Sequence, residues 1–191
     1  MAKAKKKDEK EGKKEIKIVN IVVSTSLEHD IPLEKMAATL SNTEYNPEQF
    51  PGLVIRIKEP KTSALIFSSG KVVSTGARTL KDVSESLQKI IKSLQKINVK
   101  ITVEPKINIQ NIVASGTVGM DLNLNTLAMK LDNTEYEPEQ FPGLVYKLQQ
   151  ANATFLLFSN GKVVCTGTKS EKEVYEALDK LIVNLKKVKG K

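Results

Sequence analysis

Histidine and cysteine, which catalytic triads and many metal centres depend on, are almost absent from this chain of 191 residues. It has one histidine, His29, and one cysteine, Cys165. A catalytic triad or a His/Cys metal centre needs several such groups together, and a lone thiol cannot form an internal disulfide. Neither paired carboxylates nor a glycine-rich phosphate loop can be recognised. We therefore expect no enzymatic activity, no cofactor and no metal site.

Hydrogen bonding is one kind of chemistry that the sequence does offer. Asn20 and Asn111 lie 91 positions apart, inside runs rich in Ile and Val where asparagine is disfavoured. Their amides could contact the minor-groove acceptors that A·T and T·A base pairs share, or could pair with buried backbone groups. The pattern leaves both interpretations open.

Apolar insertion is the second kind. Four of the five phenylalanines form two pairs at the same offset, Phe50 with Phe141 and Phe67 with Phe158. Phe50 and Phe141 lie in Gln-Phe-Pro-Gly turns, so each ring could pin its loop to a sheet edge or could wedge between base steps of a duplex. Four cations could reach phosphates, although each could also be an ordinary solvated side chain; they are Arg56, Lys71, Lys147 and Lys162.

The chain reads as one unit written twice. Residues 42–54 and 133–145 match at twelve of thirteen positions, and residues 66–76 align with 157–167 without an insertion. Two copies of this length favour a fused pseudo-dimer. We expect a disordered basic tail over 1–15, a first repeat over 16–98 and a second repeat over 99–191. The tail could attract phosphates or simply aid solubility, since residues 1–17 hold eight lysines and four acids of a chain with net charge +8.

Each repeat is predicted to contain a strand, a short helix, several hairpin-joined strands and a long helix, which is an α+β pattern with an antiparallel sheet. In the first repeat the strands are expected at 16–25, 53–58, 63–67 and 71–75, and the helices near 33–40, with Asp30 as N-cap, and 79–97. The strands carry apolar residues on both faces, yet two helices cover only one. The other face should be exposed and apolar, which usually marks an interaction site. No apolar run is long enough to span a membrane, and no signal segment is recognisable.

Three motifs, each present twice between residues 16 and 188, resemble the TATA-box-binding protein family. They are Asn-Ile-Val, Glu-Tyr-x-Pro-Glu-Gln-Phe-Pro-Gly-Leu and Phe-Ser-x-Gly-Lys-Val-Val-x-Thr-Gly. The resemblance implies a curved, saddle-like, ten-stranded antiparallel sheet with four helices on its convex face. It also implies a non-enzymatic general transcription factor whose concave face binds and bends the minor groove of A/T-rich TATA-box promoter DNA. The close similarity of the repeats, and Pro51-Gly52, resemble the archaeal branch.

By position, the resemblance assigns Asn20 and Asn111 to central bases. It assigns two wedges to the outermost steps, one made by Phe50 with Phe67 and the other by Phe141 with Phe158. The groove-lining residues it implies are Val22, Val73, Thr75, Val113, Val164 and Thr166. It also implies that a second-repeat loop carrying Glu137, Glu139 and Gln140 binds the B-type transcription initiation factor, through which RNA polymerase is recruited indirectly. Free protein could form a homodimer through its apolar face. The location would be cytoplasmic and nucleoid-associated in an archaeon, or nuclear in a eukaryote.

Two other functions are compatible with parts of the pattern. A sheet-surface protein that binds single-stranded RNA or DNA would stack bases on strand aromatics, for which Phe67, Phe155 and Phe158 qualify. A small-molecule enzyme would place its site between the repeats. Nothing in the sequence supports that enzyme beyond the existence of two repeats.

Overall fold

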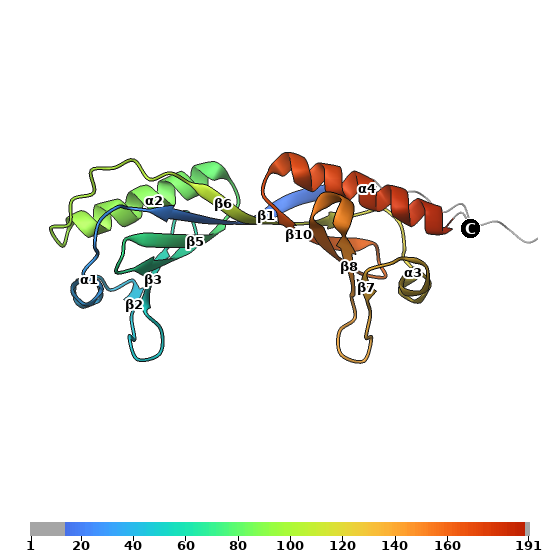
Figure 1. Cartoon of the computed structure of the whole chain (residues 1–191), viewed down its shortest axis with the longest axis horizontal. Helices are drawn as coiled ribbons and strands as arrows, with labels where there is room; N and C mark the ends of the chain where they lie inside the picture. The colour runs from blue at the N-terminus through green and yellow to red at the C-terminus, as the bar shows by residue number, and fades with distance from the viewer. Residues whose placement is uncertain (1–13, 190–191) are drawn as a thin grey trace, which may run out of the picture. The chain divides into compact units, whose positions relative to one another are not determined.

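The computed structural model describes residues 14–189, and the predicted tail over 1–15 lies almost entirely outside the described residues. Within 14–189 there are ten β-strands, four α-helices and one short 3-10 helix. They form two compact units (Figure 1). The first unit is Ile18–Ile112, and the second takes the described residues of Met1–Lys17 and Val113–Lys191.

The strands of each half of the chain are hydrogen bonded in equivalent orders. The first half has the order β2-β3-β4-β5-β1 and the second the order β6-β10-β9-β8-β7. Because β1 also neighbours β6, the ten strands of the described chain belong to one antiparallel sheet, as expected. The bounds are β1 Glu15–Ser26, β2 Thr43–Glu44, β3 Gly52–Ile57, β4 Thr62–Phe67, β5 Lys71–Ala77, β6 Asn108–Thr117, β7 Thr134–Glu135, β8 Leu144–Leu148, β9 Ala153–Leu157 and β10 Lys162–Thr168.

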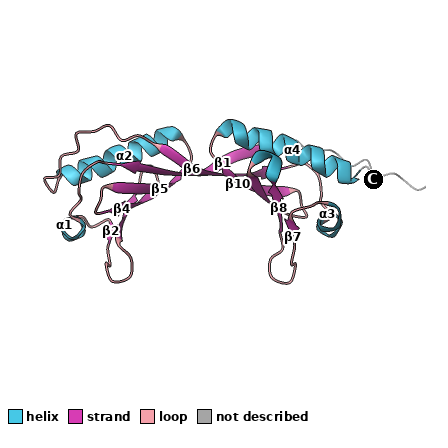
Figure 2. Cartoon of the chain, viewed as in Figure 1, coloured by secondary structure: helices cyan, strands magenta, loops and turns pink. Residues whose placement is uncertain are grey.

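Each unit has one short helix and one long helix, and the long helix runs along the strands of its own unit (Figure 2). The bounds are α1 Leu33–Thr39, α2 Leu80–Gln95, α3 Leu124–Lys130 and α4 Glu171–Lys189, with the 3-10 helix η1 at Gln149–Ala151. The prediction that Asp30 caps α1 is wrong. The N-cap is Pro32, which has no side-chain acceptor, whereas its second-repeat counterpart Asn123 accepts from the backbone N–H of Thr126.

Helix α2 shows why the sequence forms a helix at this point. The Thr79 hydroxyl accepts from the backbone N–H of Asp82, and the Asp82 carboxylate accepts from the backbone N–H groups of Thr79 and Arg78. These bonds satisfy donors that a helix start otherwise leaves unpaired. The hydrogen bond from the Arg78 backbone N–H makes the largest contribution to lowering the pKa of Asp82 below its ordinary value, and the hydrogen bonds with Thr79 add to it. Behind the cap, Val83, Leu87, Ile90 and Leu94 bury one stripe of the helix against the sheet.

The helices cover one face of the sheet in each unit and leave the other open. Along β4, Ala64 and Ile66 are buried, while the alternating Leu65 and Phe67 are only half-buried. Strand β9 repeats this alternation, with Phe155 and Leu157 buried. The expectation of an uncovered apolar face in each repeat is therefore confirmed for the residues that the structure describes.

The covered faces of the two units differ at one pair of facing positions. In the first unit the buried hydroxyls of Thr62 and Ser86 form a hydrogen bond between β4 and α2. At the equivalent positions of the second unit, Ala153 and Ala177 are buried instead. The second unit therefore has two methyl groups where the first has a hydrogen-bonded pair of buried hydroxyls.

Candidate nucleic-acid interface

The uncovered face of the first unit is organised in rows that run across three strands. Val54, Leu65 and Val73 are cross-strand neighbours on β3, β4 and β5, and all three are half-buried. The next row consists of Arg56, Ser63 and Thr75. The antiparallel register thus places an apolar row beside a row that carries hydroxyls and a cation.

The second unit repeats both rows. Val145, Leu156 and Val164 form its apolar row. Lys147, Thr154 and Thr166 form its polar row. Sequence reasoning had singled out only some members of these rows. Strand alternation puts Leu65 on the face of Phe67, but the predicted site residues do not include it. They also omit Val54, Ser63, Val145, Thr154 and Leu156, of which alternation from Phe158 would have found Leu156.

Asn20 is held in one orientation on the uncovered face. Its Oδ1 accepts from the backbone N–H of Gly76 at 2.7 Å, and it also lies 3.2 Å from the Thr75 hydroxyl. Its Nδ2 lies 3.1 Å from the same hydroxyl oxygen. Because a backbone N–H can only donate, Oδ1 must face Gly76 and the amide NH₂ must be the freer end. The interpretation that Asn20 merely pairs with the backbone therefore holds for its oxygen only.

The backbone conformation of Gly76 makes its hydrogen bond to Asn20 possible. Gly76 has φ of +97°, a region that side chains disfavour, and a Cβ there would lie 3.0 Å from the carbonyl oxygen of Lys61. The register between β1 and β5 shifts in the same place, between Ile21 and Val23. Thr75-Gly76, at the end of the repeated motif, is thus a β-bulge that directs the Gly76 N–H toward Asn20. Gly167 has φ of +98° at the equivalent point of the second repeat.

The four phenylalanines pack in two equivalent contacts, one within each repeat. Phe50 lies 5.9 Å from Phe67, and Phe141 lies 6.0 Å from Phe158, centroid to centroid and edge to face. Phe50 and Phe141 remain 44% and 42% exposed. The rings therefore do pin their loops against the strands, and they still present apolar surface to solvent.

Glycines in the two Gln-Phe-Pro-Gly turns make room for these rings. A Cβ at Gly52 would lie 2.7 Å from a ring carbon of Phe50, and a Cβ at Gly143 would lie 2.6 Å from a ring carbon of Phe141. The backbone N–H of Phe141 donates to the carbonyl of Glu137, as that of Phe50 does to Asn46. The same turn therefore positions a phenylalanine and displays its polar side chains on a projecting loop, seen between β2 and β3 and between β7 and β8 in Figure 1.

The predicted cations and loop acids are all exposed, as the sequence suggested. Arg56 donates to the carboxylate of Glu44 at 2.9 Å, an exposed pair that contributes little to stability. Lys71, Lys147 and Lys162 form no ion pair within the described chain. The loop residues expected to bind a partner are Glu137, Glu139 and Gln140.

Two side chains that other functions would use, Phe155 and Cys165, lie in the core and not on the uncovered face. Phe155 is fully buried on the covered face, so it cannot stack a base, and one of the three aromatics of the single-strand alternative is lost. Cys165 is buried, and burial raises the pKa of its thiol to about 11. Within 14–189 no three His, Cys, Asp or Glu side chains cluster as metal ligands would, and no helix has the length and apolarity that crossing a bilayer requires.

Comparison with known proteins agrees with this geometry. The family model described as "Transcription factor TFIID (or TATA-binding protein, TBP)" matches residues 15–97 and again 106–188. The chain is 49% identical to the TATA-box-binding protein of Thermococcus kodakarensis over 90% of each chain, and 49% identical to that of Methanocaldococcus jannaschii over 91% of this chain and 95% of that one. A solved structure of Methanococcus jannaschii TBP superimposes with a TM-score of 0.85 at 48% identity, covering 91% of this chain and 99% of that one. The chain therefore belongs to the TATA-binding protein family of non-enzymatic, DNA-binding general transcription factors.

Proposed function

We propose that the two repeats predicted at 16–98 and 99–191 hold the minor groove of an A/T-rich TATA-box promoter on their uncovered faces. The observation that supports the proposal is an uncovered apolar row on each repeat. In the first repeat the same face carries the amide of Asn20, held by Gly76, and each repeat also has a pair of packed phenylalanines. An apolar surface of this kind suits the walls and floor of a minor groove, where A·T pairs expose only acceptors.

Asn20 supports a specific mechanism for base selection. With Oδ1 engaged by Gly76 and one N–H of the amide directed at the Thr75 hydroxyl, the second N–H of the NH₂ group can donate to adenine N3 or thymine O2. Guanine adds an amino group at the same edge, so two donors would face each other. We assign the same role to Asn111 through the repeat. The reverse amide orientation would favour G·C, and the bulge at Gly76 thus selects the preferred base pair.

The phenylalanine pairs are proposed to bend the duplex. Each pair presents one exposed ring, Phe50 or Phe141, packed on a strand ring, so that a wedge is supported from behind. Inserting such a wedge unstacks a base step at a cost of a few kcal/mol, which apolar contact with the opened groove offsets. Pyrimidine–purine steps such as T-A cost less to deform, so part of the preference would be indirect.

The loop between β7 and β8 is proposed to bind the B-type initiation factor, which in turn recruits RNA polymerase. Glu137 stands where the first repeat has Asn46, so this loop carries an additional carboxylate while its backbone turn is the same. Since the DNA-facing rows of the two repeats are nearly identical, such a partner would supply the direction of binding. Glu137→Asn, which copies the first repeat, should weaken factor recruitment and leave binding to bare DNA unchanged.

Two smaller proposals follow from the same surface. When DNA is absent, two copies of the chain should bury their uncovered faces against each other, and sedimentation with and without a TATA duplex would detect this dimer. Binding to promoter DNA places the protein at the nucleoid, which in an archaeal-type cell is in the cytoplasm.

A mobility-shift titration tests the main proposal. The protein should bind a TATA duplex at least tenfold more tightly than the same duplex with G·C pairs at the central steps, since each mismatched pair costs about 1–3 kcal/mol. Equal affinity for the two duplexes would refute sequence-selective binding. Stronger binding to either single strand than to the duplex would instead support the sheet-surface alternative.

A further inference from the structure

The linker between α2 and β6 covers part of the first unit as an extended segment. Figure 1 shows it running back from the C-terminal end of α2 to the start of β6, and the backbone N–H of Val99 donates to the carbonyl of Leu94 in α2. From 97 to 107 every second residue is buried or half-buried, and the residues between them are exposed. This alternation is typical of an extended chain with one side against a surface. The covered residues are all apolar, and they are Ile97, Val99, Ile101, Val103, Pro105 and Ile107.

The second repeat has no equivalent apolar segment in its sequence. At the repeat offset of 91, all but the last of these positions fall on residues without an apolar side chain, which are Lys6, Asp8, Lys10, Gly12 and Lys14. Lys14 belongs to the described chain, and its Nζ donates to the carboxylate of Asp179 on α4 at 2.7 Å. This ion pair marks the side of α4 that the equivalent segment reaches, and it places a charge where the first repeat has Pro105.

Helix α4 exposes apolar residues on this side. Tyr175 and Val183 are 48% and 51% exposed, and Ile182 is half-buried. Residues four apart lie one above the other on a helix, so Tyr175, Asp179 and Val183 share one face. At the positions that correspond to Tyr175 and Val183, helix α2 has the polar residues Ser84 and Lys92. The first repeat thus has apolar residues in its linker, whereas the second has them on the long helix.

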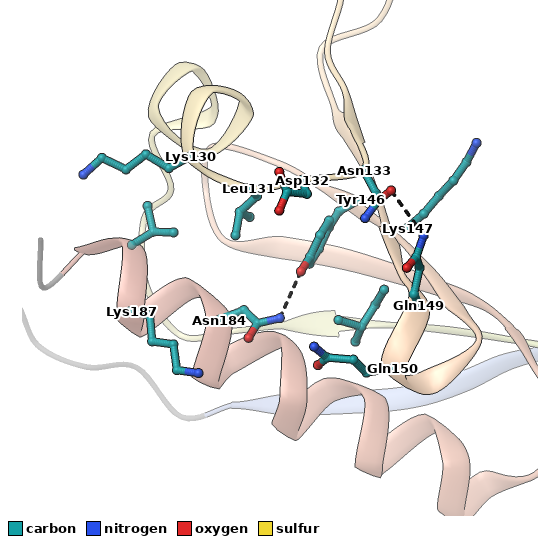
Figure 3. A pocket seen from close by; sticks show the side chains of 12 residues that line it. Lys130, Leu131, Asp132, Asn133, Tyr146, Lys147, Gln149, Gln150, Asn184 and Lys187 are labelled. Carbon is teal, nitrogen blue, oxygen red and sulfur yellow. Dashed lines mark hydrogen bonds between the residues drawn. The ribbon is translucent and has the colours of Figure 1, made fainter.

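The side of α4 that faces β8 already has partners within its own unit. A groove of about 650 Å³ lies there, between α4 and the end of β8 (Figure 3). At this groove Asn184 donates to the Tyr146 hydroxyl at 2.9 Å, and close by Lys180 donates to the carbonyl of Gln150 at 2.8 Å. These bonds hold α4 to the β8 side, and the large apolar residues that α4 exposes lie on the face that contains Asp179.

We propose that the apolar face of α4, defined by Tyr175, Asp179, Ile182 and Val183, binds an extended segment of a partner protein with aliphatic residues at every second position. The linker is the template for this occupant, because it is such a segment and it lies at the equivalent place in the first repeat. Exposed apolar groups gathered on one face usually mark an interaction site.

Charge and position narrow the kind of partner. The exposed carboxylates of Asp179 and Glu176 border the apolar face, so the segment should carry lysine or arginine among its outward residues. The buried stripe of α4 packs on the covered face of the sheet. The proposed site is therefore separate from the rows assigned to DNA, and a partner could bind it while the protein holds a promoter.

The probe is a fluorescein-labelled peptide that copies residues 97–107 of the linker, titrated against the full chain and read by anisotropy. The reference peptide has serine at the buried and half-buried positions and keeps the exposed residues. Because the aliphatic side chains supply the binding, the parent should prefer the linker peptide by about tenfold or more.

Tyr175→Ser with Val183→Lys gives α4 the residues that α2 has at these positions. Both positions are exposed, so the fold should tolerate the change. This double variant should bind the linker peptide about fivefold to 50-fold more weakly, because the exposed parts of two large apolar side chains are lost. Leu80→Ser with Met129→Lys removes two exposed apolar residues elsewhere and adds the same charge, so it should stay within about twofold of the parent.

A further variant leaves the apolar face intact and supplies an occupant from the chain itself. It introduces the linker pattern before β1, with the substitutions Lys6→Ile, Asp8→Val, Lys10→Ile and Gly12→Val. A tethered segment has a far higher effective concentration than a free peptide, so this variant should no longer bind the probe. Undiminished binding would contradict the proposal.

Three other results would overturn the proposal. They are equal binding of the linker and reference peptides, an equal loss in the control with Leu80→Ser and Met129→Lys, and sedimentation of a dimer that Tyr175→Ser with Val183→Lys abolishes. The last result would identify a second copy of the chain as the occupant. Mobility shifts on the TATA duplex should be the same for every variant, which keeps this test separate from that of promoter binding.

Discussion

Asn20→Asp changes the hydrogen-bonding character of the uncovered face without changing its shape. One carboxylate oxygen can still accept from the backbone N–H of Gly76, so the bulge and its register shift should persist. The other oxygen replaces the amide NH₂ that we assign to the bases. The substitution thus replaces a donor by a charged acceptor at the one point where A·T pairs also present acceptors.

The expected magnitude follows from the loss of one base contact. A good base contact is worth about 1–3 kcal/mol of discrimination, which corresponds to a loss of about fivefold to 150-fold in affinity for the TATA duplex. A charged acceptor that faces base acceptors places the effect toward the upper part of this range. A duplex with one central G·C pair should lose less, because the guanine amino group can donate to the carboxylate.

Fluorescence titration of parent and Asn20→Asp with both duplexes measures the two affinities. The account predicts that the ratio between them shrinks or inverts. Thr75→Val is the matched control, since it removes the neighbouring hydroxyl and keeps the Asn20–Gly76 bond, and it should preserve the A·T preference. An unchanged ratio in Asn20→Asp, with the variant still folded, would refute the assignment of the outward NH₂ group.

Three further predictions concern bending, packing and pH. Phe158→Ala should sharply reduce the bend of a bound duplex, measured by energy transfer between its ends, whereas Phe158→Leu should retain most of it; equal bends in all three proteins would contradict the wedge. Ser86→Ala should lower the free energy of unfolding by about 1–3 kcal/mol because the Thr62 hydroxyl loses its buried partner, and adding Thr62→Ala should recover part of that loss; additive losses in denaturant melts would argue against the pair. Because the pKa of Asp82 is lowered in the fold, its contribution should be complete above the ordinary value of 3.8 and decline as the pH falls below it, so acid titration of Asp82→Asn should show a shallower loss of stability than the parent.

Much of the fold could be predicted from the sequence because the repeat doubles every signal. The apolar alternation of the strands, the Gly-containing hairpin turns and the stripe on α2 each occur twice at a constant offset. The same offset singles out the four phenylalanines, and the structure shows that Phe50 packs on Phe67 and Phe141 on Phe158. The uncovered face followed from counting helices against apolar strand faces. These features depend on local patterns, which a single sequence contains.

Features that depend on register could not be predicted in this way. The hydrogen bond from the Gly76 N–H to Asn20 joins residues of different strands across a bulge. No local sequence pattern predicts which backbone N–H a bulge will direct toward a side chain on the neighbouring strand. Asp30 was placed at the cap of α1 by residue type alone, although the helix begins after Pro32, two residues later. By residue type, Phe155 is as good a candidate for stacking a base as Phe158. In the structure the alternation of β9 places Phe155 in the core.

The most direct test of the account is binding to a duplex in which the A·T pairs of the TATA element are replaced by inosine·cytosine pairs. These pairs have the major groove of G·C and lack the guanine amino group, so their minor groove resembles that of A·T. The account predicts affinity close to that of the TATA duplex and well above that of the G·C duplex. Binding as weak as that of G·C would show that the protein reads the major groove, and it would contradict the assignment of the uncovered faces to the minor groove.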